Sequence, residues 1–306
     1  MRFPDFLIIG AMKSGTTTLY RDLLTNSGVF MPTEKEPHSL CEDAVLTPEG
    51  RAAYAALFEG VREDQVCGEA STGYTKLPDH PGVVGRAKAL LPGHARFVYL
   101  VREPVSRAIS HHHHFMTSGR IRDPIDVAVE TVPSLIDYSL YAMQVEPWME
   151  AFGAEHVRVM IFERFVKDRR GAAVEAAGFL GIPPRPELVE ADKVFNQSES
   201  KPVLAKSGPM RWMQQSWAYR KMVRPVLSLE ARERLRRALL PRANPRPSPP
   251  SPETVDRIIE RVAPDAERLA RLMGIPSPIW EFDKVREKVL AGGQANNSPP
   301  ESVQSR

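Results

Sequence analysis

Four hydroxyl side chains, one lysine and two glycines are concentrated in a short segment, residues 10–18, directly after an apolar run at residues 6–9. Gly10 and Gly15 have the spacing of the two glycines of a P-loop, but Thr16 occupies the place of the lysine that a nucleotide triphosphatase uses. A glycine-containing turn between a strand and a helix directs backbone N–H groups and the helix dipole at an anion. The segment therefore predicts a loop that binds a smaller terminal phosphate and no metal ion.

The side chains of this loop add hydroxyl groups and one mobile positive charge, that of Lys13. We assign the predicted anion site to Lys13, Ser14, Gly15, Thr16, Thr17 and Thr18. Leucines at helical spacing predict that a helix follows the loop. The alternative is a strand-turn-helix in which the glycines serve only the turn.

A second candidate phosphate ligand, Arg102, follows a predicted strand at residues 96–101. The carboxyl ends of strands are where open α/β sheets bind ligands, and a guanidinium group matches phosphate oxygens in geometry. Pro104 suits the first turn of a helix. The alternative is that Arg102 and Arg107 are ordinary surface charges, paired with Glu103.

The two segments together are similar to the cofactor site of one enzyme family. Residues Phe6 to Leu19 resemble the 5′-phosphosulfate-binding loop of sulfotransferases that use 3′-phosphoadenosine 5′-phosphosulfate (PAPS), and the sequence Lys-Ser-Gly-Thr-Thr is specific to that family. In the family, the arginine that ends the second strand and the serine eight residues later bind the 3′-phosphate; these positions are Arg102 and Ser110. The resemblance implies a PAPS cofactor, the product adenosine 3′,5′-bisphosphate (PAP), and a P-loop-like three-layer α/β fold with a central parallel sheet flanked by helices.

A candidate general base, Glu36, lies between these segments. The sequence Lys-Glu-Pro-His resembles the segment that carries the catalytic glutamate in carbohydrate sulfotransferases of the heparan-modifying kind. A carboxylate at Glu36 could take the proton from an acceptor hydroxyl as that hydroxyl attacks sulfur. The family usually continues with two aromatic residues, where this chain has Ser39 and Leu40. The alternative is a solvated charged turn.

Two further positions bear on the charge around the sulfuryl group. The heparan-type enzymes often have Glu-Lys-Thr-Pro-x-Tyr where this chain has residues 69–74, and Ala70 occupies the place of their lysine. Lys13 is therefore expected to carry more of the charge stabilisation. Lys201 falls where a flexible loop with basic residues covers the cofactor in the family, and it is a further candidate cofactor ligand.

Histidines offer competing bases, because histidine titrates near neutral pH. They are His38 and the four consecutive residues His111–His114. Consecutive residues on a helix point about 100° apart, so these four cannot converge on one metal ion. Cysteine partners at zinc-finger spacing are also missing. We predict no metal site, with one or two of the four histidines facing the active-site cleft and the others facing solvent.

The order of the predicted elements favours one α/β domain. Strand-like runs alternate with helical stretches, at residues 6–9, 66–70, 96–101 and 157–162, and this predicts a parallel sheet covered by helices. The predicted parts are a sulfotransferase domain (1–240), a proline-rich connector (241–252), a docking C-terminal helix (253–282) and a disordered tail (291–306). Residues 203–240 look helical and basic, and either pack their aromatic side chains or form an acceptor-side lid.

Charge and composition limit the other partners. A net charge of +3 is too small to indicate nucleic acid, and no apolar run is long enough to span a membrane. Two cysteines, Cys41 and Cys67, are expected to be free thiols in a reducing compartment. Together with the composition, which is rich in alanine and arginine, this predicts a cytoplasmic bacterial enzyme.

The leading hypothesis is a PAPS-dependent sulfotransferase that acts on a hydroxyl-bearing acceptor. A sugar is the first expectation for that acceptor, and a lipid or a natural-product alcohol is the alternative. The rival classes are a small-molecule kinase with a degenerate P-loop and a nucleotide-binding module without catalysis.

Overall fold

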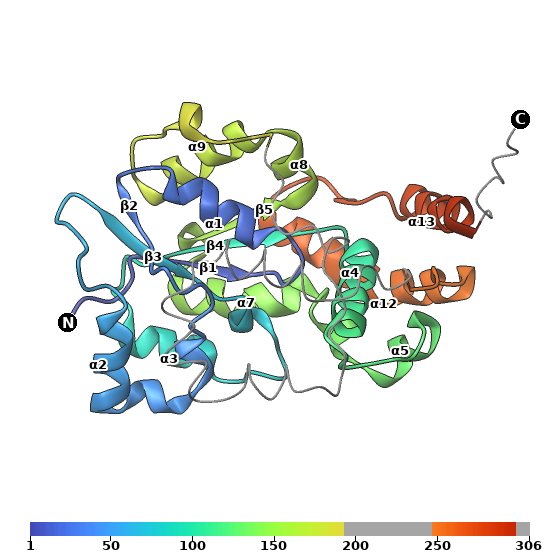
Figure 1. Cartoon of the computed structure of the whole chain (residues 1–306), viewed down its shortest axis with the longest axis horizontal. Helices are drawn as coiled ribbons and strands as arrows, with labels where there is room; N and C mark the ends of the chain where they lie inside the picture. Colours follow the sequence, from blue (N-terminus) through green and yellow to red (C-terminus); the bar gives the residue numbers. More distant parts are fainter. Residues whose placement is uncertain (193–246, 298–306) are drawn as a thin grey trace, which may run out of the picture.

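Five parallel strands form the centre of the molecule, in the spatial order β2-β3-β1-β4-β5 (Figure 1). The computed structural model describes residues 1–192 and 247–297. The strands are β1 (Phe6–Gly10), β2 (Val29–Phe30), β3 (Val66–Ala70), β4 (Arg96–Val101) and β5 (Val157–Ile161). The strands predicted from the sequence are all present, whereas the two-residue β2 is too short to leave a periodic pattern. The predicted α/β fold with a central parallel sheet is confirmed.

Helices cover both faces of this sheet, which gives three layers (Figure 1). The first seven are α1 (Thr16–Leu24), α2 (Pro48–Ala56), α3 (Val83–Leu90), α4 (Pro104–Thr117), α5 (Ile125–Thr131), α6 (Ser134–Asp137) and α7 (Tyr141–Phe152). They are followed by α8 (Phe162–Lys167), α9 (Arg169–Leu180), α12 (Pro252–Met273) and α13 (Phe282–Asn297). Short 3₁₀ turns, among them η1 (Ser39–Cys41) and η3 (Thr72–Thr75), connect some of these elements.

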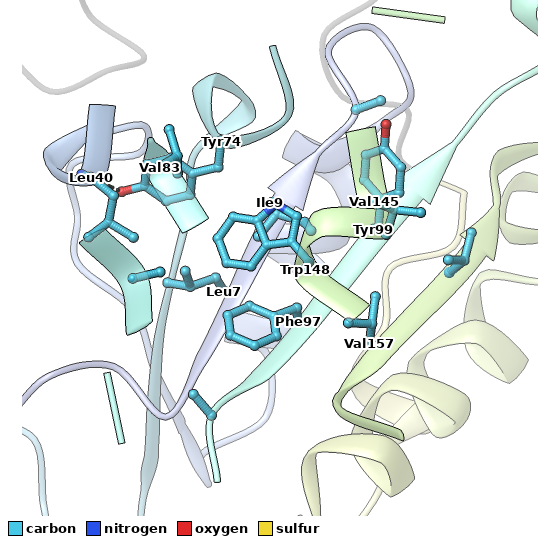
Figure 2. Packing of buried hydrophobic residues seen from close by; sticks show 14 of the residues in the cluster. Leu7, Ile9, Leu40, Tyr74, Val83, Phe97, Tyr99, Val145, Trp148 and Val157 are labelled. Atoms are coloured by element: carbon cyan, nitrogen blue, oxygen red, sulfur yellow. Dashed lines mark hydrogen bonds between the residues drawn. The ribbon is translucent and has the colours of Figure 1, made fainter. Parts of the chain in front are cut away.

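The two faces of the sheet build separate parts of the core, because successive side chains of a strand point to opposite faces. In β1, Phe6 and Ile8 pack towards α1 and α9. Leu7 and Ile9 lie on the opposite face, with Trp148 of α7 (Figure 2). Continuous apolar runs in β1 and β4 are therefore explained by burial on both faces.

The sheet order places three carboxyl ends side by side. β1 lies between β3 and β4, so the segments that follow these three strands meet at one edge of the sheet. After β1, Ala11 N donates to Leu100 O of β4 at 2.7 Å, and beyond β3, Ser71 N donates to Ile8 O of β1 at 3.1 Å. Crevices at this edge are the usual ligand sites of open α/β sheets.

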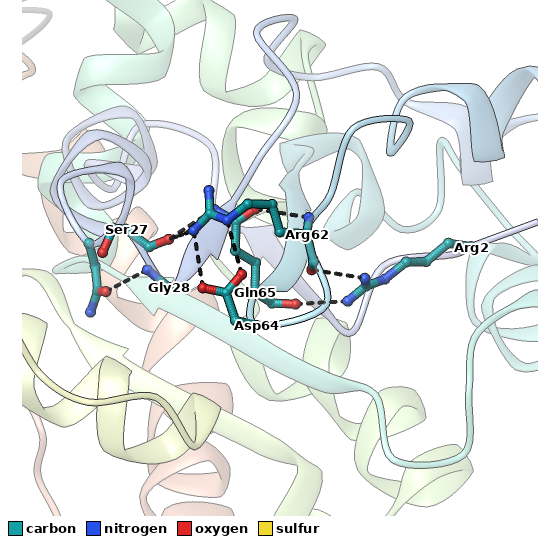
Figure 3. A network of polar contacts seen from close by, with 7 residues as sticks. Arg2, Ser27, Gly28, Arg62, Asp64 and Gln65 are labelled. Atoms are coloured by element: carbon teal, nitrogen blue, oxygen red, sulfur yellow. Dashed lines mark hydrogen bonds and ion pairs between the residues drawn. The ribbon is translucent and has the colours of Figure 1, made fainter.

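Polar contacts fix the opposite, amino-terminal edge (Figure 3). Arg2 donates to Gln65 O at 2.8 Å and to Arg62 O at 3.4 Å, just before β3. The Gln65 side chain in turn donates to Ser27 O at 2.9 Å, just before β2. These contacts hold the starts of β1, β2 and β3 together, far from the edge where the predicted site residues lie.

The C-terminal helix α12 docks on the domain through its apolar side. Val255 and Leu269 are fully buried against it, and Asp265 accepts from Ala142 N at 2.8 Å and Met143 N at 3.0 Å. A carboxylate there satisfies N–H groups of the first turn of α7, which have no acceptor within their own helix.

Trp280, beyond α12, connects the C-terminal part of the chain to the segments that follow β4 and β5. The Trp280 ring lies 5.9 Å from the Tyr141 ring, and Trp280 Nε1 donates to Glu163 at 3.2 Å. The other carboxylate oxygen of Glu163 accepts from Glu103 N at 2.9 Å, directly after β4.

Some predicted parts lie at the edge of the described residues or beyond it. Residues 247–250 of the predicted connector have no helix or strand. Helix α13 continues through residues 291–297, which the sequence assigns to a disordered tail. Lys201 and the aromatic segment 203–240 lie outside the described residues.

Two other sequence predictions concern membranes and cysteines. Within residues 1–192 and 247–297, no helix has both the length and the apolar character needed to cross a lipid bilayer. Cys41 and Cys67 are both free thiols, as predicted.

Candidate active site

The segment between β1 and α1 forms a tight loop at the carboxyl edge of the sheet. Gly15, just before α1, has φ +89°, a left-handed conformation that favours glycine. A Cβ atom at Gly15 would also lie 2.8 Å from the Phe162 ring. The first N–H groups of a helix have no acceptor within it, so those of α1 are available to an anion at the loop.

The side chains of the loop fit a bound oxyanion. Ser14 is fully buried, and its Oγ has no hydrogen-bond partner among the described residues. Thr16 is buried, while Lys13, Thr17 and Thr18 are half-buried. A buried hydroxyl without a partner is costly, and an oxygen of a 5′-phosphosulfate would satisfy it. We therefore retain all six loop residues as proposed cofactor ligands.

Arg102 lies against this loop. Its guanidinium group stacks on the Phe162 ring, 5.0 Å from the centroid, and Nη1 donates to Lys13 O at 3.3 Å. The Tyr141 hydroxyl donates to Arg102 O at 2.6 Å, which fixes the backbone after β4. No described carboxylate forms an ion pair with Arg102, so its charge is available to an anion.

Glu103 and Arg107 do not form the surface ion pair that was the alternative interpretation of this segment. Glu103 caps α4, accepting from Val105 N and Ser106 N at 2.7 Å each. Arg107 is fully buried, and its guanidinium group donates to Leu135 O at 2.5 Å. Neither arginine pairs with Glu103. Ser110 is half-buried on α4, about two helical turns beyond Arg102.

We predict that Arg102→Ala and Ser110→Ala each weaken PAP binding and hardly change the affinity for adenosine 5′-monophosphate. The reason is that both side chains are assigned to the 3′-phosphate, which the monophosphate lacks. A hydrogen bond to a charged group contributes about 1.5–3 kcal/mol, so the loss for PAP should be at least about 10-fold. Calorimetric titration of both ligands measures it, with exposed Arg62→Ala as the control. Equal losses for the two ligands would show that the 3′-phosphate site is misassigned.

Glu36 lies on a loop that is bonded to the end of β3. Its backbone N–H donates to Ala70 O at 3.0 Å, and its own φ is +62°. The carboxylate accepts from Lys35 Nζ at 2.7 Å and lies 3.5 Å from His38 Nε2. The Thr72 hydroxyl donates to the same carboxylate at 3.4 Å. The loop therefore presents Glu36 as an oriented carboxylate, about one-third exposed to solvent.

The charge state of Glu36 follows from these contacts. Burial acts to raise the pKa of Glu36, but hydrogen bonds and charges from His38 and Lys35 outweigh it and hold the pKa well below its usual range. The carboxylate is therefore ionised at neutral pH and ready to accept a proton. It is also a weak base, so it can take that proton only once the acceptor hydroxyl has become acidic.

A second carboxylate, Glu69 of β3, is linked to this loop by hydrogen bonds. Glu69 is buried, and hydroxyl groups of Tyr54, Tyr74 and Ser71 donate to it. Ser71 Oγ also accepts from His38 N at 3.1 Å. Burial raises the pKa of Glu69, against the effect of these hydroxyl groups. Glu69 thus connects to the Glu36 loop through Ser71, an arrangement that depends on tertiary contacts, although Glu69 and Tyr74 both fall in the segment that the resemblance singles out.

The prediction for the four histidines needs a correction. His111 and His112 are both buried, and His112 Nε2 hydrogen-bonds to Asp123 O at 2.9 Å. Neither ring faces solvent, because His111 stacks on Tyr138 and His112 contacts the segment before α5. His113 and His114 are half-buried rather than solvent-facing. The described residues contain no group of three or more His, Cys, Asp or Glu side chains that could hold a metal ion.

A family model called sulfotransferase domain matches residues 3–222. The chain belongs to the sulfotransferase domain family. The match covers the loop after β1, the Glu36 loop and Arg102, and the family uses PAPS and yields PAP. The resemblance inferred from the sequence is thus confirmed, while the role of each residue remains a proposal.

Curated proteins and a solved structure are similar to this sulfotransferase chain. The mouse heparan sulfate glucosamine 3-O-sulfotransferase 6 is 29% identical over 219 residues, which are 67% of this chain and 60% of that protein. The mouse 3-O-sulfotransferase 3A1 is 27% identical over 217 residues, 67% of this chain and 52% of that protein. The chain thus spans about half to three-fifths of the length of these relatives.

The solved structure supports the fold of this sulfotransferase chain. The crystal structure of a sulfotransferase from Alicyclobacillus acidocaldarius superposes with a TM-score of 0.60 at 23% identity, over 90% of this chain and 98% of that one.

Proposed function

We propose that this protein transfers the sulfuryl group of PAPS to a hydroxyl group of a carbohydrate or small-molecule acceptor, with Glu36 as the general base. The observation that carries the proposal is the convergence of three segments at the carboxyl edge of the sheet. They are the loop after β1, Arg102 after β4, and the Glu36 loop bonded to the end of β3.

The residues have separate proposed roles. PAPS, when bound, supplies a sulfuryl group on a good leaving group, and the acceptor oxygen–sulfur bond forms as the bond from sulfur to PAP breaks. Glu36 takes the proton from the attacking hydroxyl. Lys13 and the N–H groups of the loop stabilise the charge that develops on the departing oxygen. Arg102 and Ser110 hold the 3′-phosphate.

The relatives' names favour a sugar acceptor, because both are heparan sulfate glucosamine 3-O-sulfotransferases. The Glu36 loop, which carries the Lys-Glu-Pro-His sequence, supports the same class. A lipid or natural-product alcohol is the second candidate, favoured by Ser39 and Leu40 where two aromatic residues were expected.

Thermal unfolding with PAP and with ATP plus magnesium tests the proposal. A ligand that binds only the native state stabilises it by about 2.7 kcal/mol at a concentration of 100 times its Kd, which raises Tm by several degrees. We expect PAP to raise Tm with and without EDTA, and ATP with magnesium to raise it little. The reverse order would support the kinase interpretation instead.

A further inference from the structure

Lys76 is a half-buried cation beside the Glu36 loop, and the roles above do not use it. Its ammonium group lies over the Tyr138 ring, 5.7 Å from the centroid, and no described residue forms an ion pair with it. Burial lowers the pKa of Lys76, and the charge of Glu36 opposes that shift more than that of Asp79 does. A partly buried cation without an ion pair is costly, so a ligand anion is the natural partner for it.

His111 has one ring nitrogen that is buried without a hydrogen-bond partner. The other, Nδ1, lies 3.4 Å from Arg107 Nη1. A guanidinium group can only donate, so Nδ1 accepts and the proton of the neutral ring is on Nε2. Within the described residues, Nε2 has no acceptor. His111 is thus a neutral N–H donor that lacks an acceptor.

The His111 ring is held in one orientation. It stacks on Tyr138 with ring centroids 5.5 Å apart, and it packs against Phe115 in an edge-to-face arrangement with ring centroids 4.2 Å apart. Arg107 is itself fixed, because it donates to Ser139 Oγ and Leu135 O. Tyr138, whose hydroxyl donates to Asp79, therefore contacts both Lys76 and His111.

Contacts place Lys76 and His111 near the two loops that carry Lys13 and Glu36. Thr75, which precedes Lys76, donates to Ile9 O at 2.8 Å just before the loop after β1, and Thr72 of the same turn donates to Glu36 at 3.4 Å. The Tyr138 ring contacts both Lys76 and His111. Lys13, Glu36, Lys76 and His111 come from four segments: the loop after β1, the loop before η1, the residue after η3, and α4. Three of them are donors of hydrogen bonds and one is the proposed base.

We propose that Lys76 and His111 bind the transferring sulfuryl group together with Lys13, Lys76 as a second cation and His111 as a neutral N–H donor. The assignment rests on the proposed function. A sulfuryl group passes from the cofactor loop to the hydroxyl at Glu36, and its oxygens need donors on the side away from the loop.

Calorimetric titration of the full chain with PAPS and with PAP tests this assignment, because only PAPS carries the sulfuryl group. Lys76→Met and His111→Phe should each lower the PAPS affinity at least about 10-fold and leave the PAP affinity within about twofold of wild type. His111→Gln places an amide N–H near the position of Nε2 and should retain most of the PAPS affinity. Exposed Lys88→Met is the control for a lost lysine charge.

A second readout separates binding from a purely structural role. The ¹⁵N chemical shift of His111 Nε2 should move when PAPS is added to the wild-type chain and stay in place with PAP. Equal losses of PAPS and PAP affinity, unchanged PAPS affinity, or the same ¹⁵N shift with both ligands would overturn the assignment. A wild-type chain that binds neither ligand would overturn the proposed function as well, whereas the other outcomes leave that function standing.

Discussion

Replacement of Glu36 by glutamine should reduce turnover about 10²–10⁴-fold at saturating PAPS, while the affinity for PAP changes little. Glutamine keeps the size of the side chain and can still accept hydrogen bonds from Lys35 and Thr72, but it cannot take up the acceptor proton. The loss should therefore appear in kcat and leave PAP binding intact. Initial rates of sulfate transfer, with calorimetric titration of PAP beside them, measure both quantities.

The controls for this prediction lie on the same loop and on α4. Glu34→Gln removes a neighbouring exposed carboxylate and should leave turnover near that of wild type. His38→Ala removes a contact that orients Glu36 and should cost less than Glu36→Gln. If Glu36→Gln keeps near-normal turnover while one single-histidine variant is inactive, that histidine is the base.

The low pKa of Glu36 does not exclude it as the base. A carboxylate held ionised by Lys35 and His38 is a poor proton acceptor for a free alcohol. The proton of the attacking hydroxyl becomes acidic as the new oxygen–sulfur bond forms, so a weak base suffices when transfer occurs late.

Replacement of Lys13 by alanine should lower kcat about 10²–10³-fold and change the affinity for PAP far less. Charge builds on the bridging oxygen as the bond to sulfur breaks, so an ammonium group there stabilises mainly the transition state. The substitution should leave the loop backbone unchanged, because Arg102 donates to the backbone carbonyl of Lys13, which alanine retains. The conformational strain of the left-handed backbone at φ +71° is also the same for alanine as for lysine.

The measurement compares kcat, the KM for PAPS and the Kd for PAP in Lys13→Ala and in the exposed control Lys167→Ala. A higher KM for PAPS with unchanged kcat would make Lys13 a binding residue and remove its proposed role in bond breaking.

The parts of the site that are local in sequence could be predicted from it. β1, the loop and α1 follow one another without interruption, so apolar runs, glycines and hydroxyls predict the structure, while the use of the loop stays a proposal. The position of Arg102 directly after β4 is also predicted, because the end of a strand is visible in the sequence. The Glu36 loop depended on a resemblance, since a charged turn by itself has no distinctive periodicity.

The parts that depend on tertiary packing could not be predicted. The sequence leaves open a surface charge at Arg107, but this side chain is buried, because the segment around α6 supplies its acceptors. Two of the four histidines are interior for the same reason. Lys76 has nothing distinctive in its own segment, and only the fold brings it beside the Glu36 loop and onto the Tyr138 ring, which stacks on His111.

Incubation of the wild-type chain with ³⁵S-labelled PAPS, a panel of acceptors and EDTA tests the central claim most directly. The panel contains sulfated and unsulfated glucosamine oligosaccharides, sterols and simple alcohols, and the products are separated from PAPS and inorganic sulfate by chromatography. We expect labelled sulfate ester on at least one hydroxyl-bearing acceptor, formed with an equal amount of PAP and lost in Glu36→Gln. Binding of PAP without any labelled ester across the panel, or label transfer that Glu36→Gln leaves unchanged, would contradict it.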